Sequence, residues 1–192
     1  MVKREIRILG IDDAPFSKRD KNVLAVGSVF RGGDYMDGLI SFKVQRDGND
    51  STEKIIRAVK KTKHRRQIQC IMIDGLALGG FNLVDIQELQ KKTKMPVIVT
   101  IRKMPDMAEI EKALRAARLN IKEKMKLMQK AGRIYRMKVK GRNLFLQLAG
   151  IDLRKARNII SISATHSLIP EPLRISHLIA SGIIKGESKG RA

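Results

Sequence analysis

Two short apolar segments of this chain each end on aspartate, and this pattern constrains the fold more than any other feature. Residues 7–13 read Arg-Ile-Leu-Gly-Ile-Asp-Asp, and residues 68–74 read Ile-Gln-Cys-Ile-Met-Ile-Asp. Apolar runs of this length, rich in β-branched residues, are typical of strands that are covered on both faces. Since a helical segment lies between them, the two strands are expected to run parallel in one mixed α/β sheet.

The remaining segments extend this sheet and cover it. Residues 22–30 and 38–45 read as strands around a glycine-rich turn, so the first three strands should form an antiparallel meander. Capping-box spacing at residues 50–53 predicts a helix, a second helix is expected from Asn82, and residues 96–101 read as another buried strand. Apolar positions in residues 106–131 predict one long amphipathic helix, and residues 135–146 predict a hairpin with one apolar and one basic face.

These elements predict a single domain. Two short helices complete it, so the domain is expected to span residues 1–186. Residues 187–192 are rich in Gly, Ser and Lys and are expected to be a flexible basic tail.

Asp12 and Asp74 are predicted to face each other at one edge of the sheet. Neighbouring parallel strands lie about 4.8 Å apart, and their carboxyl ends open onto the same crevice. Two carboxylates that close repel each other unless a proton or a cation intervenes, and their oxygens suit Mg²⁺ or Mn²⁺. A metal ion there would activate water for phosphodiester cleavage, with Asp47 or Asp13 as a third carboxylate. The alternative is that both aspartates only cap the loops that follow their strands.

The charge of the chain points to a polyanionic partner. Its 192 residues include 40 Lys and Arg against 19 Asp and Glu, which gives a formal net charge of +21. The excess is concentrated in residues 51–66 and 106–142, which indicates surfaces that grip DNA or RNA phosphates, although solvated helix faces carry similar charge runs. The cationic candidates are Lys54, Arg57, Lys60, Lys61, Arg65, Arg66, Arg136, Lys138, Lys140 and Arg142.

Composition disfavours several other classes of protein. With 5 Phe, 2 Tyr and no Trp, few side chains are available to stack on bases, so binding should be mostly ionic. The single cysteine, Cys70, permits neither a disulfide framework nor a cysteine metal cluster and fits a reducing compartment. No apolar run approaches membrane-spanning length, so a cytoplasmic protein that does not bind membranes is expected.

Several segments resemble a known family. In order and approximate spacing, the chain resembles endonuclease V at Leu9-Gly10-Ile11-Asp12, residues 35–42, Ile73-Asp74-Gly75, residues 95–98 and Arg174-Ile175-Ser176. It is more similar to an uncharacterised archaeal family, a domain of unknown function regarded as a distant relative of endonuclease V, through residues 10–13, 47–50, 74–75, 80–82 and 170–174. The resemblance implies an RNase H-like fold. Endonuclease V cleaves near deaminated purines, especially inosine, with carboxylates and Mg²⁺.

The resemblance transfers only part of the endonuclease V site. The two strand-end aspartates of that family correspond to Asp12 and Asp74, its lysine falls near Arg102, and its strand-separating wedge corresponds to the turn at Tyr35. Arg102 keeps the positive charge of the lysine, but it does not act as a proton donor in the same way.

Two groups of the endonuclease V site are replaced. Its third carboxylate falls on Val44, which cannot bind a metal ion, and its late histidine falls on Leu173. His177 lies four residues after Leu173, hence on the same helical face, and is a candidate substitute.

Two functions are therefore compatible with the sequence. The first is a divergent metal-dependent endonuclease in which Arg102 steadies a phosphate and Phe16 or Phe81 stacks on a base. The second is a catalytically inactive nucleic-acid-binding protein that uses the same basic surfaces. A role for the 106–131 helix on a protein partner or membrane surface is a third alternative, but that helix lacks aromatic anchors.

Overall fold

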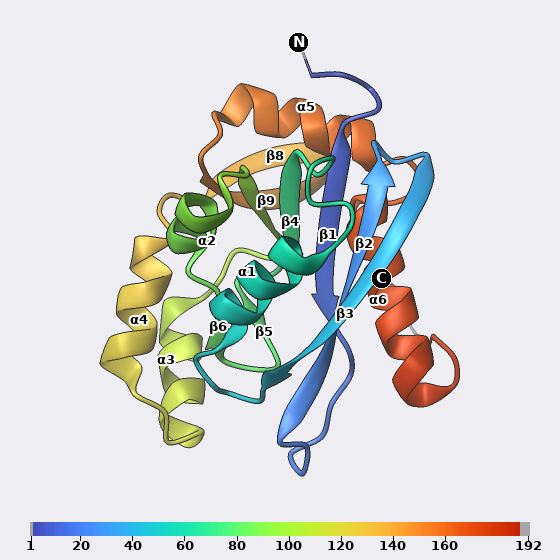
Figure 1. The fold of residues 1–192 in the computed structure, drawn as a ribbon. Helices are drawn as coiled ribbons and strands as arrows, with labels where there is room; N and C mark the ends of the chain where they lie inside the picture. The colour runs from blue at the N-terminus through green and yellow to red at the C-terminus, as the bar shows by residue number, and fades with distance from the viewer. Residues whose placement is uncertain (1, 189–192) are drawn as a thin grey trace.

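The computed structural model describes residues 2–188, which form a seven-stranded mixed sheet in the order β3-β2-β1-β4-β7-β9-β8 (Figure 1). Strands β1 (Arg7–Asp13), β2 (Asn22–Arg31) and β3 (Tyr35–Gln45) form the predicted antiparallel meander. Strands β4 (Cys70–Asp74) and β7 (Val97–Ile101) run parallel to β1. The predicted hairpin, β8 (Tyr135–Val139) and β9 (Arg142–Ala149), adds to the edge of β7. The predicted mixed α/β fold is confirmed.

Helices cover both faces of this sheet (Figure 1). Helices α1 (Ser51–Lys61) and α2 (Ile86–Thr93) pack on one face, where Leu9 and Ile11 of β1 join the larger hydrophobic cluster. Helices α5 (Leu153–Ser163) and α6 (Glu171–Lys185) lie on the other face, which receives Ile8. Because side chains alternate along a strand, Gly10 and Asp12 lie on the same face as Ile8. Asp12 is thus directed toward α6.

The second helix begins later than the sequence indicates. Asn82 and Leu83 form the short strand β6 (Asn82–Leu83), which pairs with β5 (Ala77–Leu78) instead of starting a helix. Helix α2 begins at Ile86, where the Asp85 side chain accepts a hydrogen bond from the backbone N–H of Glu88. The stronger capping signal at Asp85 therefore decides where this helix begins.

The prediction of one long helix over residues 106–131 is wrong. The segment forms two helices, α3 (Met107–Ala116) and α4 (Ile121–Lys130). Arg118 adopts a left-handed conformation with φ of 56°, and the Asn120 side chain caps α4 by accepting from the backbone N–H of Glu123. The apolar spacing did not reveal the break, because both helices direct apolar side chains toward the same cavity, such as Met107 of α3 and Met128 of α4.

Lys124 anchors α4 to the loop between β3 and α1. This lysine is buried, and its Nζ donates to the carbonyl oxygen of Gly48 at 2.7 Å and to the side-chain oxygen of Asn49. Burial lowers the pKa of the Lys124 ammonium group. A buried charge of this kind is stabilised mainly by the hydrogen bonds that it makes.

Truncation of Lys124 should therefore destabilise the protein. Lys124→Ala is expected to reduce the free energy of unfolding by about 2 kcal/mol, because Gly48 and Asn49 lose a charged donor and the stem of the side chain leaves a gap. Urea denaturation measures the change. Lys126→Ala, at an exposed position of the same helix, is the matched control and should change stability by about 0.5 kcal/mol or less. Equal stabilities of the two variants would contradict the anchoring role.

Helix α6 approaches β1 closely at Gly10. A Cβ added at Gly10 would lie 2.4 Å from the carbonyl carbon of Pro172 and 2.7 Å from the backbone nitrogen of Leu173. The Ser176 side chain bridges the two elements, since its Oγ donates to the Gly10 carbonyl at 2.8 Å and accepts from the Ser28 N–H at 3.0 Å. This contact fixes α6 over the end of β1.

The sequence also led us to expect no membrane-spanning segment and a basic tail over residues 187–192. Within residues 2–188, no helix combines the length and apolar character needed to cross a bilayer. Of the predicted tail, residues 189–192 lie outside the described residues.

Candidate active site

An open cleft lies at the end of the sheet where β1 and β4 finish. Its volume is about 440 Å³, and it is lined by Asp12, Asp13, Ala14, Pro15, Phe16, Asp74, Arg102 and His177. Ile11 pairs with Ile73 in the parallel ladder, so Asp12 and Asp74 follow at equivalent positions of neighbouring strands. Six of the candidate residues named from the sequence line this cleft: Asp12, Asp13, Phe16, Asp74, Arg102 and His177.

Asp12 is held by two hydrogen bonds at the bottom of the cleft. Its side chain is nearly buried, with 5% of the residue exposed. The Nδ1 atom of His177 lies 2.8 Å from Oδ2 of Asp12, and Oδ1 accepts from the backbone N–H of Asp13 at 2.9 Å. The hydrogen bond with Asp12 raises the pKa of His177, so the imidazole keeps its proton to higher pH than an exposed histidine. His177, the candidate substitute for the late histidine of endonuclease V, thus contacts Asp12.

Asp74 lies near a residue of like charge, Asp12, and a residue of opposite charge, Arg102. Burial raises the pKa of the Asp74 carboxyl most, and the negative charge of Asp12 raises it further. Arg102, which directly follows β7, opposes this effect with an ion pair of 2.7 Å between its Nη2 and Oδ2 of Asp74. Since two negative charges in one partly buried site repel each other, the cleft favours a cation near Asp12 and Asp74.

The two candidates for a third carboxylate are already bonded to backbone N–H groups. Oδ2 of Asp13 accepts from Gly79 at 2.9 Å, and burial raises the pKa of this carboxyl to about 6. Oδ1 of Asp47 accepts from Phe81 at 2.9 Å, and Asp47 does not line the cleft. Asp13 is therefore the nearer of the two to the Asp12–Asp74 pair.

Asp12 and Asp74 offer the oxygen donors that a hard divalent cation requires. Within residues 2–188, no group of three His, Cys, Asp or Glu side chains is arranged to hold a metal ion. Mg²⁺, however, is commonly bound through only one or two carboxylates, with substrate phosphates and water completing its coordination. Burial raises the pKa of Asp74 most and the charge of Asp12 raises it further, and a bound cation would relieve the repulsion between the two carboxylates. The donor set fits a two-carboxylate magnesium or manganese site.

The predicted cationic residues are exposed or partly exposed, but they do not all surround the cleft. Lys54, Arg57, Lys60 and Lys61 lie on α1, and Arg65 and Arg66 follow it. Arg136, Lys138, Lys140 and Arg142 lie on the β8–β9 hairpin. Lys140 Nζ donates to the carbonyl of Thr165, whose hydroxyl in turn contacts the Gly33 carbonyl in the β2–β3 turn. Because Arg31 at that turn pairs with Arg7, the hairpin tip lies toward the start of β1, away from Asp12.

Of the three aromatic residues predicted to contact nucleic acid, one lines the cleft and two lie elsewhere. Phe16 lines the cleft and is 40% exposed, so it is placed to meet a ligand of Asp12 and Asp74. Phe81 lines a different cavity. Tyr35 pairs with Arg31 at the first residue of β3, and it therefore lies at the end of the sheet opposite the cleft.

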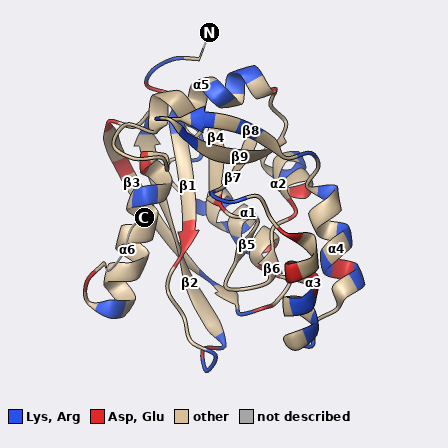
Figure 2. Ribbon diagram, turned by 180° about the vertical axis from the view of Figure 1, so that it is seen from behind, with Lys and Arg blue, Asp and Glu red and all other residues tan. Residues whose placement is uncertain are grey.

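Sequence reasoning missed the loop between β1 and β2. It carries Lys18, Arg19 and Lys21, all exposed, directly after the cleft residues Ala14, Pro15 and Phe16. Figure 2 shows blue, basic segments at the tip of the β1–β2 loop, beyond the red end of β1. The available signal was the Lys-Arg pair only five residues after the Asp12–Asp13 pair. This loop is the nearest basic segment in sequence to the carboxylates.

Comparisons with known proteins agree with this architecture. The family model described as endonuclease dU matches residues 4–184. A UPF0215 protein of Methanothermobacter thermautotrophicus is 50% identical over 192 residues, which cover 100% of this chain and 94% of that protein. A crystal structure of a protein of unknown function from Archaeoglobus fulgidus has a TM-score of 0.84 and 41% identity, covering 94% of this chain and 99% of that one.

Endonuclease V shares the fold at much lower identity. The Ciona intestinalis enzyme, in complex with a DNA that contains inosine, has a TM-score of 0.56 and 13% identity, with 88% of this chain and 82% of that chain covered. The resemblance seen in the sequence is thereby confirmed at the level of the fold. Since the endonuclease dU model spans nearly the whole sequence, this chain belongs to the endonuclease dU family.

Proposed function

We propose that this protein binds DNA and cleaves its phosphodiester backbone with the help of Mg²⁺ or Mn²⁺. The observation that carries the proposal is the pair of carboxylates, Asp12 and Asp74, at equivalent ends of adjacent parallel strands in an open cleft. The endonuclease V-like fold and the family membership support it. RNA, which presents the same phosphates, is the other polymer to test.

The residues of the cleft can be given distinct tasks in this reaction. Asp12 and Asp74 would hold the divalent cation, whose chemistry in such sites is to polarise a phosphoryl oxygen and make a bound water more acidic. Arg102 would steady a phosphate oxygen with the guanidinium that now contacts Asp74. His177 holds a proton at the Asp12 carboxylate, and its raised pKa suits a general acid for the departing oxygen. Phe16 would stack on a neighbouring base.

Cleavage of defined oligonucleotides tests the proposal. The family name makes DNA with a single deoxyuridine the first substrate, and the inosine-containing DNA bound by Ciona endonuclease V suggests the second. Unmodified DNA and matching RNA serve as comparisons. We expect cutting of a modified strand with Mn²⁺ or Mg²⁺ and none with EDTA. No cutting of any substrate would reject the nuclease.

One observation favours a second candidate, a binding protein without catalysis. Arg102 already pairs with Asp74 through a 2.7 Å ion pair, which offsets the repulsion between Asp74 and Asp12 without a metal ion. Under this alternative, the same basic surfaces bind nucleic acid and the cleft is only structural. The cleavage assay decides between the two candidates, because both predict binding.

Binding should depend strongly on salt and on the β1–β2 loop. With about four phosphates neutralised, affinity is expected to fall on the order of a hundredfold between 50 and 200 mM salt. Replacing both Lys18 and Arg19 with alanine should reduce the slope of log affinity against log salt by about 2, since each lost phosphate contact removes about 0.9. Fluorescence anisotropy at several salt concentrations measures the slope.

A double variant of the hairpin is the matched control. Lys138→Ala with Arg142→Ala removes the same charge from exposed positions on β8 and β9. It should leave the slope close to the wild-type value, because the hairpin tip lies away from the cleft. A reduced slope in the hairpin variant and not in the loop variant would place the nucleic acid on the hairpin instead.

A further inference from the structure

A groove of about 500 Å³ lies between strand β3 and helix α1. Strand β3 is an edge of the sheet, and Figure 1 shows α1 on the face of the sheet next to this edge. The helix begins next to Gln45, whose N–H donates to the N-cap residue Asp50 at 3.0 Å. It ends near Gly38, where an added Cβ would overlap the imidazole of His64 in the turn after the helix. The helix therefore runs back along the edge strand, and the two form the walls of the groove.

The backbone of β3 presents unpaired hydrogen-bonding groups along this groove. The Arg46 N–H donates to the Lys21 carbonyl at 3.0 Å, so in the antiparallel register the even-numbered residues of this stretch bond toward β2. The N–H and C=O groups of the odd-numbered residues Leu39, Ser41 and Lys43 therefore point away from β2. Within residues 2–188, no strand or loop pairs with these outward groups. They form an open edge of the sheet.

The open edge ends at Gln45. The outward N–H of this residue is occupied by Asp50, and its carbonyl accepts from Nδ2 of Asn82 at 2.8 Å. These two contacts limit the open edge to residues 39–43, a stretch of about 17 Å at about 3.4 Å per residue. An open edge of this kind is a template for a further strand, and extended peptides are recognised by adding to such edges.

The lining of the groove combines an apolar floor with cations. Ile40 and Phe42 of β3 are partly buried and pack against the larger hydrophobic cluster, and Ala58 lines the groove from α1. The cations that line it are Lys43, Lys54, Arg57 and Lys61. Among the described residues, no carboxylate pairs with Lys43 or Lys61, and the other two cations have carboxylate neighbours at the start of α1. A ligand of this groove should carry negative charge around an apolar group.

We propose that an extended segment of a partner protein binds this groove as an added antiparallel strand on β3, with acidic residues on either side of an apolar one. A peptide backbone supplies both the acceptors and the donors that Leu39, Ser41 and Lys43 require. A phosphate backbone offers acceptors alone, so it would leave the outward carbonyls unsatisfied and the floor of Ile40 and Phe42 uncovered. Two copies of this chain paired through β3 would bring like charges together, which disfavours self-association.

The spacing of the α1 residues defines the order of side chains in the partner segment. Lys54 and Lys61 are separated by about 10.5 Å along the helix axis, with Ala58 between them. In an added strand, side chains at positions i, i+2 and i+4 lie on one face and extend over about 13 Å. The flexible stems of the two lysines cover the difference. The expected pattern is an acidic residue, an apolar residue two positions later and a second acidic residue two positions after that.

The groove lies on the opposite face of the sheet from the candidate active site. Its floor packs on the side of Leu9 and Ile11, whereas Asp12 contacts His177 on the α6 side. Ser41 pairs with a residue of β2 that in turn pairs with Asp12, so the groove is also two strands away from the cleft. A bound segment would leave the cleft open, so the partner and a nucleic acid can be bound together.

Binding of a fluorescein-labelled peptide, Gly-Ser-Glu-Thr-Val-Thr-Glu-Ser-Gly, tests this proposal. Fluorescence anisotropy should show saturable binding to the wild-type protein. In the proposed strand the Val and Glu side chains lie on the α1 side, so the Thr N–H groups face β3 and the Val N–H faces away. N-methylation of both Thr nitrogens should therefore weaken binding about tenfold, whereas N-methylation of the Val nitrogen should leave the affinity unchanged.

Amide hydrogen exchange, followed by NMR, locates the bound strand. In the free protein the outward N–H groups of Leu39, Ser41 and Lys43 should exchange fast, while those of Ile40 and Phe42 are protected by pairing with β2. A saturating amount of the unmodified peptide should slow exchange at the first three residues and leave the other two unchanged. Binding without slower exchange at the three outward groups would overturn the proposal.

Charge reversal on α1 tests the cationic wall of the groove. Arg57→Glu with Lys61→Glu should weaken binding of the unmodified peptide about tenfold, because both cations line the groove. Lys60→Glu with Lys63→Glu produces the same net charge at residues outside the groove and should bind the peptide as tightly as wild type. All four substitutions are at exposed positions, which tolerate such changes without unfolding. Equal weakening in both double variants would overturn the proposal.

Other occupants of the groove give different results. Weaker binding of a single-stranded DNA to the Arg57→Glu, Lys61→Glu protein than to the control double variant, without any peptide binding, would assign the groove to nucleic acid. A wild-type dimer in sedimentation that the same substitutions dissociate would assign the groove to a second copy of this chain. Either result would overturn the proposal, as would equal binding of the unmodified and the Thr-N-methylated peptides.

Discussion

Replacing Asp12 or Asp74 with alanine is expected to reduce metal-dependent cleavage of DNA by on the order of a thousandfold, or about 4 kcal/mol of transition-state stabilisation. Each variant removes one of the two carboxylates that meet at the ends of β1 and β4. Binding to DNA should be retained or slightly tightened, because a negative charge is removed from a site that faces phosphates. Single-turnover cleavage and anisotropy binding, measured on the same substrate, separate the two effects.

Three other aspartates serve as controls for this prediction. Asp34→Ala removes an exposed carboxylate in the β2–β3 turn, at the far end of the sheet, and should leave cleavage unchanged. Asp13→Asn and Asp47→Asn should have effects of about tenfold or less if their carboxylates mainly accept backbone N–H bonds, as the contacts with Gly79 and Phe81 indicate. Full activity of Asp12→Ala and Asp74→Ala would exclude the carboxylate site, and a thousandfold loss in Asp13→Asn would identify the third carboxylate.

Gly10→Ala is expected to have the largest effect on stability, a loss of about 3 kcal/mol in the free energy of unfolding. The added Cβ would overlap backbone atoms of Pro172 and Leu173, and backbone cannot move aside as a flexible side chain can. Helix α6 would have to shift, which strains the Ser176 bridge to Gly10 and the contact of His177 with Asp12. Urea denaturation without divalent cations measures the loss.

A glycine within α6 provides the matched control. At Gly182, an added Cβ would meet nothing within 4 Å, and alanine is favoured over glycine in a helix interior by up to about 1 kcal/mol. Gly182→Ala should therefore be as stable as wild type or more stable. If Gly10→Ala proved equally well tolerated, α6 would not depend on close contact with β1, and the position of His177 would need another explanation.

The fold was predictable where local pattern and tertiary environment agree. β1 and β4 are continuous apolar runs in the sequence and are central strands in the structure, because a strand covered on both faces needs apolar residues at every position. The break between α3 and α4 was not predicted. Its apolar residues keep helical spacing on both sides, and the capping signal at Asn120 is weaker in the sequence than the periodicity around it.

Asp12 and Asp74 were predictable from the sequence, because parallel pairing of their strands brings the two strand ends together. His177 was a candidate only through the resemblance to endonuclease V, whose late histidine falls on Leu173, four residues earlier on the same helical face. Tyr35 was associated with the site by resemblance alone, and the register of β3 places it at the opposite end of the sheet. A side chain at the end of a strand can belong to the site only if that end lies at the cleft. The register of strand pairing determines at which edge of the sheet each strand end lies.

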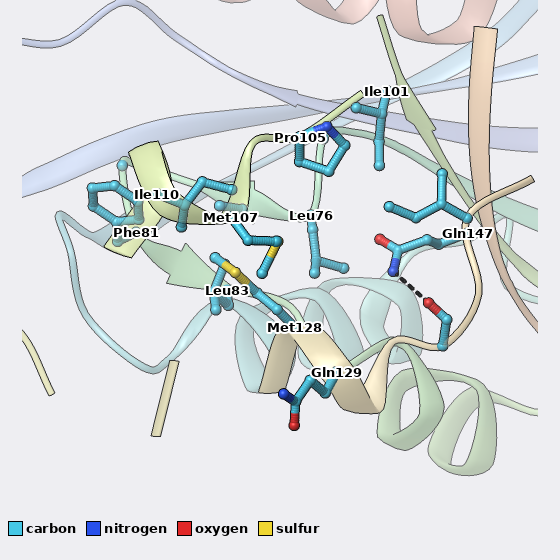
Figure 3. Close-up of a pocket in the computed structure, with 15 residues that line it drawn as sticks. Leu76, Phe81, Leu83, Ile101, Pro105, Met107, Ile110, Met128, Gln129 and Gln147 are labelled. Atoms are coloured by element: carbon cyan, nitrogen blue, oxygen red, sulfur yellow. Dashed lines mark hydrogen bonds between the residues drawn. The ribbon is translucent and has the colours of Figure 1, made fainter. Parts of the chain in front are cut away.

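By itself, the sequence determined the alternation of strands and helices, the two strand-end aspartates and the excess of positive charge. These are properties of neighbouring residues, and local physical chemistry is enough to interpret them. Only the tertiary structure decided that Arg102 pairs with Asp74 and that Gln147 enters an apolar cavity next to the cleft (Figure 3). Each of these contacts joins residues far apart in the chain, so it depends on how the sheet twists and how α3, α4 and α6 pack against it.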